Sequence, residues 1–241
     1  MSFLSSRSAG SAAITNDYVL YFKNDSTGGS ADIINNGGLA FSGFATAGNA
    51  TITNNGGLTF TYRSTAGNAA IINTANASAD FSSSSGINGD NKISAGSIAG
   101  AGFYQLGAIE LTVGSNNLST GVSGVIAGIG GSLVKTGTGT LILSGANTYT
   151  GGTTFASGAV SVSSDANLGD LAGILTFKGG TLQISGTVFN TTARTVILGA
   201  DGGTLDIADA ANNFVVSQGI SGSTLTKSGA GTLTLTGAAS F

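Results

Sequence analysis

The sequence contains no proline, cysteine, histidine or tryptophan, and only 8% of its 241 residues are charged. Without cysteine no disulfide can form, and without histidine or cysteine the common nucleophile–base pairs of hydrolases cannot be assembled. The 8 lysines and arginines are scattered singly, which argues against a nucleic-acid surface. No apolar run approaches the roughly 20 residues of a membrane helix. These absences argue against several classes of enzyme and binding protein.

What the sequence has in excess is glycine, with 41 residues. Hydrophobic residues make up 41% of the chain and the net charge is only −3, whereas disordered chains combine low hydrophobicity with high net charge. The composition therefore predicts a folded protein whose turns are made by glycine, asparagine, serine and threonine.

The chain repeats internally. Residues 32–39 (DIINNGGL) and 51–58 (TITNNGGL) are offset by 19 residues, and residues 71–73 begin a third copy. The second half repeats more loosely, as a glycine followed by alternating apolar residues, at Gly139, Gly158, Gly180, Gly203 and Gly231. The longest match, between residues 132–149 and 223–241, has an offset of 92 residues, which we interpret as about four turns of the shorter unit.

Apolar and polar residues alternate within each unit of the second half, which predicts short, half-buried β-strands. The residues expected to face the core, each stacked on its counterpart in the next unit, are Leu141, Leu143, Val160, Val162, Leu182, Ile184, Leu205, Ile207, Leu233 and Leu235. The residues expected to face outward are Thr140, Ser161, Gln183, Asp206 and Thr234. Helical periodicity is absent.

Strands this short are stable only when stacked, and units of about 20 residues predict a solenoid. We predict an all-β fold, a right-handed single-stranded parallel β-helix with about three short strands per rung. Residues 1–241 are expected to form one β-helix fragment. It comprises an irregular start or cap (1–22), Asn/Gly-rich rungs of about 19–20 residues (23–81), more variable rungs (82–131) and a last set of rungs truncated at the C-terminus (132–241).

Asparagine and glycine are expected to form the corners of the rungs. Asn35, Asn54 and Asn73 recur at one rung position, where their amides can hydrogen-bond along the stack. Positive φ angles are predicted at the Gly-Gly pairs 37–38, 56–57, 151–152, 179–180 and 202–203. No helix is predicted after these pairs, so they do not indicate phosphate-binding loops.

Residues 137–169 (GTGTLILSGANTYTGGTTFASGAVSVSSDANLG) resemble the passenger-associated transport repeat, or autotransporter-associated β-strand repeat, of bacterial autotransporter passengers. The features of that repeat are LVK at residues 133–135, the corner TYTGGT at 148–153 and a shorter second copy from 225–227 (LTK) onward. Such passengers cross the outer membrane of Gram-negative bacteria with a C-terminal β-barrel translocator and fold outside as a long β-helix.

The resemblance implies a structural, non-enzymatic passenger fragment of type V secretion, a cell-surface stalk or adhesin whose repeats assist translocation and vectorial folding. Its expected location is extracellular and associated with the outer membrane, although no signal peptide or barrel is recognisable in the sequence. The expected partners are the β-barrel translocator of the full-length protein and a host or cell surface. An open strand edge near Phe241 also predicts end-to-end self-association.

A polysaccharide-active enzyme is the main alternative, because β-helix enzymes of that kind use clustered carboxylates. The densest group of acids, with its nearest basic neighbour, is Asp165, Asp170, Arg194, Asp201, Asp206 and Asp209. We expect Asp206 to lie beside Gln183 on the outer face. Residues 199–207 faintly resemble a calcium-binding nonapeptide, which requires tandem copies that are missing here.

An ice-binding or other fibrous solenoid is the second alternative, because threonines alternate at residues 136–140 and 232–236. That ladder is interrupted by the Ser, Gln and Asp expected to face outward. The lysines, which we interpret as solvated rung edges rather than parts of a Ser-Lys site, are Lys92, Lys135, Lys178 and Lys227. No catalytic, cofactor-binding or metal-binding residue is therefore predicted.

Aromatic residues are concentrated in the first third of the chain. We interpret them as residues that fill the core and cap the first rung, and the alternative is that they form an adhesive surface. These residues are Tyr18, Tyr21, Phe22, Phe41, Phe44, Phe60, Tyr62 and Phe81.

Overall fold

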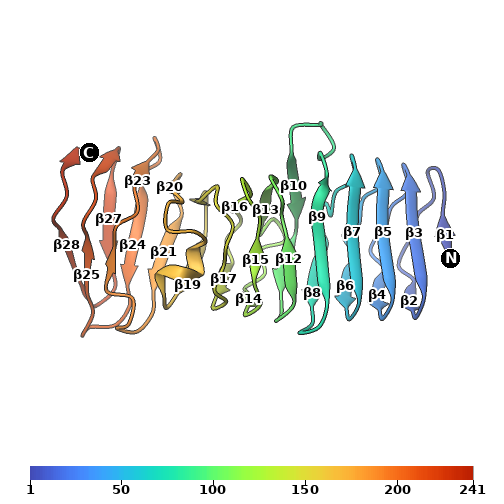
Figure 1. Cartoon of the computed structure of the whole chain (residues 1–241), viewed down its shortest axis with the longest axis horizontal. Helices are drawn as coiled ribbons and strands as arrows, with labels where there is room; N and C mark the ends of the chain where they lie inside the picture. The colour runs from blue at the N-terminus through green and yellow to red at the C-terminus, as the bar shows by residue number, and fades with distance from the viewer. Residues whose placement is uncertain (241) are drawn as a thin grey trace.

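The computed structural model describes residues 1–240, which form a β-solenoid of about 11 turns. Strands lie across the long axis of the molecule, and the two termini lie at opposite ends (Figure 1). All the paired strands among these residues are parallel, and the single helix is a short 3-10 turn, η1 (Asp165–Leu168). The predicted all-β solenoid is confirmed. Over residues 1–240, no helix is long and apolar enough to cross a membrane.

Two sheets build the N-terminal half. Sheet 1 is, in spatial order, β1 (Ser2–Phe3), β3 (Val19–Asn24), β5 (Gly38–Gly43), β7 (Gly57–Tyr62), β9 (Ser78–Ser84), β12 (Phe103–Gln105) and β15 (Ile126–Ala127). Sheet 2 is β2 (Ala13–Asn16), β4 (Asp32–Asn35), β6 (Thr51–Asn54), β8 (Ala70–Asn73) and β11 (Ser97–Ala99). A column of single parallel bridges, from Ser8 to Thr65 in steps of one rung, lies on the third side.

Three sheets build the C-terminal half. Sheet 3 is β10 (Lys92–Ala95), β13 (Glu110–Val113), β16 (Ser132–Lys135), β18 (Thr153–Phe155), β20 (Leu175–Phe177), β23 (Val196–Leu198), β26 (Ile220–Gly222) and β29 (Ala239–Ser240). Sheet 4 is β14 (Thr120–Val122), β17 (Thr140–Leu143), β19 (Ala159–Val162), β21 (Thr181–Ile184), β24 (Gly203–Ile207) and β27 (Leu225–Ser228). Sheet 5 is β22 (Thr191–Thr192), β25 (Asn213–Val216) and β28 (Thr232–Leu235). A complete rung passes through three sides in turn.

The start of the chain differs from the prediction. An irregular start was expected over residues 1–22, but β2 pairs residue for residue with β4, and β3 does so with β5. The reason is that residues 13–22 (AITNDYVLYF) are another copy of the 19-residue unit. Asp-Tyr-Val replaces the Asn-Gly-Gly of the later copies, which hides the repeat in the sequence while its inward positions stay apolar.

The predicted core columns are confirmed over four rungs of sheet 4. Leu141, Val160, Leu182 and Leu205 are successive partners, and Leu143, Val162, Ile184 and Ile207 form the parallel column. The columns do not continue to β28, which lies in sheet 5, where Leu233 pairs with Phe214. The outward column also differs, because Ser161 pairs with Ile142 rather than with Thr140, and Thr234 pairs with Val215.

The long internal match is therefore not a whole number of turns. β16 carries the LVK of the first copy in sheet 3, whereas β27 carries the LTK of the second copy in sheet 4. Four turns separate β16 from β26, and β27 lies one side further around the rod. The cause is the length of the rungs, which varies: successive partners in sheet 3 change from Thr153 to Leu175, Val196 and Ile220.

The predicted positive φ angles occur at Gly152, Gly179 and Gly202 but not at the Gly-Gly pairs of residues 37–38 and 56–57. Glycine is required at Gly37 for a different reason, because a Cβ atom there would collide with the carbonyl oxygen of Tyr18 one rung away. The N-terminal corners are thus set by close approach of stacked backbones.

Candidate functional site

The asparagines predicted to stack do form a buried ladder. The side-chain amide of Asn35 donates to Asn54 Oδ1 at 2.7 Å, and Asn54 donates to Asn73 Oδ1 at 2.7 Å. Asn16 extends the ladder at one end by donating to Asn35 at 2.6 Å. Each amide also bonds to backbone carbonyls at the corner. These groups are satisfied within the core, so the ladder is structural.

The aromatic residues of the first third divide into two sets. Phe22, Phe41, Phe60 and Phe81 are buried and stack with ring centroids 4.7 to 5.1 Å apart, as the core interpretation predicted. The aromatic side chains that are exposed instead are Tyr18, Tyr21, Phe44 and Tyr62. Tyr18 is 86% exposed, which is unusual for a ring this large.

A shallow depression of about 300 Å³ lies on the outer side of sheet 1 beside the first exposed tyrosines. It is lined by Val19, Tyr21, Gly38, Leu39, Ala40, Gly57 and Thr59. The depression arises because one rung carries Tyr18-Val19 at the corner where the next two carry Gly-Gly. Its lining is mainly apolar.

A polar ladder borders the same corner. Asn36 donates to Asp17 Oδ1 at 2.7 Å, and Asn55 donates to Asn36 Oδ1 at 2.8 Å, with all three side chains exposed. Planar amide and carboxylate groups therefore lie next to exposed apolar surface. This combination makes the N-terminal side of sheet 1 the surface best suited to contact another molecule.

The acidic residues weighed for polysaccharide cleavage do not gather. Asp206 accepts a hydrogen bond of 2.8 Å from Gln183 on the neighbouring rung, as predicted. Asp170 and Asp209 accept bonds from backbone N–H groups of their own turns. Over residues 1–240, no three Asp, Glu, His or Cys side chains come close enough to hold a metal ion.

Arg194, which the sequence offered as a partner for the acids near Asp206, lies elsewhere. Its side chain is 1% exposed, and its Nε donates to Asp165 Oδ1 at 2.7 Å. The remaining donors bind the backbone carbonyls of Asp165, Gly169, Asp170 and Gly173. Arg194 thus anchors the excursion around η1, a role for which the sequence gave no signal.

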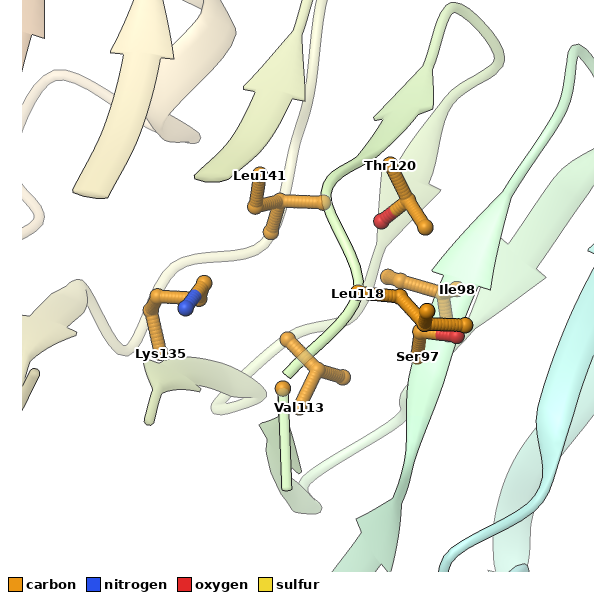
Figure 2. A pocket seen from close by; sticks show the side chains of 8 residues that line it. Ser97, Ile98, Val113, Leu118, Thr120, Lys135 and Leu141 are labelled. Atoms are coloured by element: carbon orange, nitrogen blue, oxygen red, sulfur yellow. The ribbon is translucent and has the colours of Figure 1, made fainter. Parts of the chain in front are cut away.

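Lys135 is also placed differently from the prediction, because it is buried rather than solvated. Its Nζ donates to the carbonyl oxygens of Thr136 and Gly137 at 2.5 and 3.3 Å. Burial lowers the pKa of its amine. The side chain lies beside a narrow crevice lined by Val113, Leu118 and Leu141 (Figure 2). Period-two alternation from Leu133 to Lys135 was the signal that could have revealed this orientation.

Comparisons with known proteins match the C-terminal half to a described repeat. The family model of the passenger-associated transport repeat matches residues 133–162 and 225–241. The adhesin BmaC autotransporter of Brucella suis biovar 1 (strain 1330) is 43% identical over 90 residues, which is 37% of this chain and 2% of that protein. No solved structure matches the chain. This chain thus carries the passenger-associated transport repeats of bacterial autotransporters.

Proposed function

We propose that this chain is part of the passenger of an autotransporter, where it forms a surface-exposed stalk outside the outer membrane. The observation that carries the proposal is that both transport repeats lie in one continuous parallel solenoid, where their strands pair with those of the neighbouring rungs. The chain spans about 2% of the length of the relative it matches, so partners and activities of a whole protein are part of the proposal.

The role is structural rather than enzymatic. A solenoid adds one rung at a time, and each rung presents an unpaired strand edge on which the next one forms. The β-barrel translocator of the full-length protein would deliver the chain, and core residues such as Leu141 and Leu143 would retain each emerging rung by burial. Folding outside the membrane then biases movement outward.

Surface display in a Gram-negative host tests this proposal. The chain would be placed between a signal peptide and a translocator barrel, and external protease would report how much of it reaches the surface. Deleting residues 132–152, one rung of the transport repeat, should reduce display about tenfold, because this deletion removes β16 and β17, the first two strands of the first transport repeat. A matched deletion of residues 32–50 removes one 19-residue rung and should leave display unchanged. Equal display from both deletions would contradict the proposal.

A second function, adhesion, is favoured by the depression on sheet 1 and by the similarity to an autotransporter adhesin. The exposed Tyr18 and Tyr21 are the expected anchors, because exposed tyrosines dominate many protein contacts. Cells displaying the chain with both tyrosines changed to serine should lose most of their binding to host-cell monolayers. Ile129→Ser is the control, because Ile129 is 88% exposed on a distant rung. Unchanged binding by the double variant would exclude this surface.

We also propose that copies of the chain associate end to end, because β2 and β28 each have one unpaired edge at an end of their sheets. Sedimentation should show larger species as protein concentration rises. A single monomeric species at high concentration would contradict this.

A further inference from the structure

The two transport repeats share one local arrangement although they occupy different corners of the rod. In the first, the corner joins β16 in sheet 3 to β17 in sheet 4, and Lys135 Nζ donates to the carbonyl of Thr136 at 2.5 Å and to that of Gly137, two residues later, at 3.3 Å. In the second, the corner joins β27 in sheet 4 to β28 in sheet 5, and Lys227 Nζ donates to the carbonyl of Gly229 at 2.7 Å, again two residues later. The neighbouring rungs at the two corners are unrelated, so the shared geometry comes from the repeat itself.

The glycines of the two corners are equivalent as well. Gly137 has a φ of 68° and Gly229 a φ of 75°, the left-handed region that other residues rarely adopt. A Cβ atom on Gly137 would also collide with the carbonyl oxygen of Gly114. Each lysine therefore bonds to a turn that only glycine can form without strain.

Both lysines lie in columns that are otherwise apolar. The partners of Lys135 are Val113 and Phe155. The partner of Lys227 is Leu205, which continues the aliphatic column of sheet 4. The Lys135 side chain is 1% exposed and lies beside a narrow crevice lined by Val113, Leu118 and Leu141 (Figure 2). A methionine would fill the position of Lys135 without placing a charge in the core, so packing does not explain the lysine there. Lys227 is exposed near the end of the rod.

The contacts of each lysine are local, which suggests when they form. All three acceptors, the carbonyls of Thr136, Gly137 and Gly229, lie one or two residues after the lysine, so the bonds need no neighbouring rung. Stacking, by contrast, needs a rung about 20 residues away, and bringing distant segments together carries a larger loop-closure cost.

We propose that the lysine and the glycine two residues later form a clip that closes the turn of each transport repeat before the adjacent rungs stack. The clip is a positioning device that aims the second strand of the repeat and starts a rung locally. It deepens the proposed function, on which its biological purpose rests, because a rung started in this way can template the next one during vectorial folding.

Refolding kinetics of the full 241-residue chain test the clip. Lys135→Met keeps the length of the side chain and removes the donor. The expected result is refolding about fivefold slower, with a denaturant midpoint that is unchanged or higher. Lys227→Met should act in the same direction, and its exposed position ensures that the rod still folds. Lys178→Met is the matched control, since Lys178 lies directly after a strand of sheet 3, whereas Lys135 is the last residue of one, and Lys178 is exposed.

Two results would overturn the clip. One is an unchanged refolding rate in both lysine variants. The other is faster unfolding with normal refolding, which would show that the bonds matter only in the finished rod. Refolding in solution involves no secretion, whereas the rung deletions are read by surface display. The clip can therefore fail while the stalk proposal stands, and the reverse outcome is equally recognisable.

Discussion

The N-terminal rungs and the transport-repeat rungs solve the same stacking problem in different ways. From Ala13 to Asn73 the strands of sheet 2 repeat every 19 residues, and identical side chains stack: isoleucine on isoleucine and asparagine on asparagine. Beyond Ser132 the spacing varies from rung to rung, and the core columns mix leucine, valine, isoleucine and phenylalanine. A strict period thus permits ladders of one residue type, and a variable period does not.

The variable half compensates with single buried polar residues at its irregular corners. Arg194 holds the excursion around η1, and Lys135 holds the turn after β16. The N-terminal half needs no such anchor, because each of its corners is held by the next copy of itself. A fixed repeat length therefore replaces specific side-chain anchors at the corners. Three changes would test this difference between the two halves.

The largest effect is expected from Phe41→Ala in the regular half. Phe41 stacks on Phe22 at 4.7 Å and on Phe60 at 5.1 Å, so the substitution leaves a cavity between two rings and should cost about 4 kcal/mol of unfolding free energy. Phe155→Ala, which loses a single ring partner, should cost about 1 kcal/mol less. Urea titrations followed by circular dichroism would measure both. Equal losses would show that the continuous stack adds nothing.

The next effect is expected from Arg194→Met in the variable half. Removing the guanidinium group leaves the backbone carbonyls around η1 without donors, which should lower the free energy of unfolding by about 3 kcal/mol. Hydrogen exchange should accelerate mainly in residues 163–173, because the anchor is local. The exposed Lys178→Met should change stability by less than about 0.5 kcal/mol. A uniform acceleration along the whole rod would contradict the idea of a local anchor.

Per pH unit, the smallest expected effect is a dependence of stability on alkaline pH that comes from two buried tyrosines, Tyr104 and Tyr149, beyond the regular rungs of residues 13–73. Burial raises the pKa of Tyr149 to about 12 and raises that of Tyr104 as well, from a usual value of 10.0. Above pH 10 the unfolded chain therefore loses these protons first, and stability should fall by about 1 kcal/mol per pH unit for each tyrosine. The contribution of Lys135 to the pH dependence of stability has the opposite sign. Burial lowers the pKa of its amine below 10.5, so stability rises as the pH approaches that value.

Tyr149→Phe should flatten the fall between pH 10 and 12, and Lys135→Met should remove the rise below pH 10.5. Stability measured by urea titration at several pH values would resolve both. The same fall in a variant lacking both Tyr149 and Tyr104 would contradict the assignment.

The candidate surface was predictable only in part. The concentration of aromatic residues near the N-terminus was visible, but the sequence did not show which rings face outward. Strand phase decides this: Tyr21 precedes Phe22, and alternation sends the first outward and the second into the stack. The depression beside Tyr21 forms because the next two rungs have a glycine at the position that pairs with Val19. It could be predicted only with the register of the strands known.

The sequence by itself determined the fold class, the period and the buried asparagine ladder, because alternation and a fixed 19-residue repeat allow few other arrangements. The tertiary structure decided which sheet each C-terminal strand joins, the burial of Lys135 and the partners of Arg194. The physical reason is that, when the number of residues per rung varies, the spacing of strands in the sequence does not determine which side of the rod each strand occupies. The offset of 92 residues between the transport repeats becomes four turns and one side only when the stacked neighbours fix where each strand pairs.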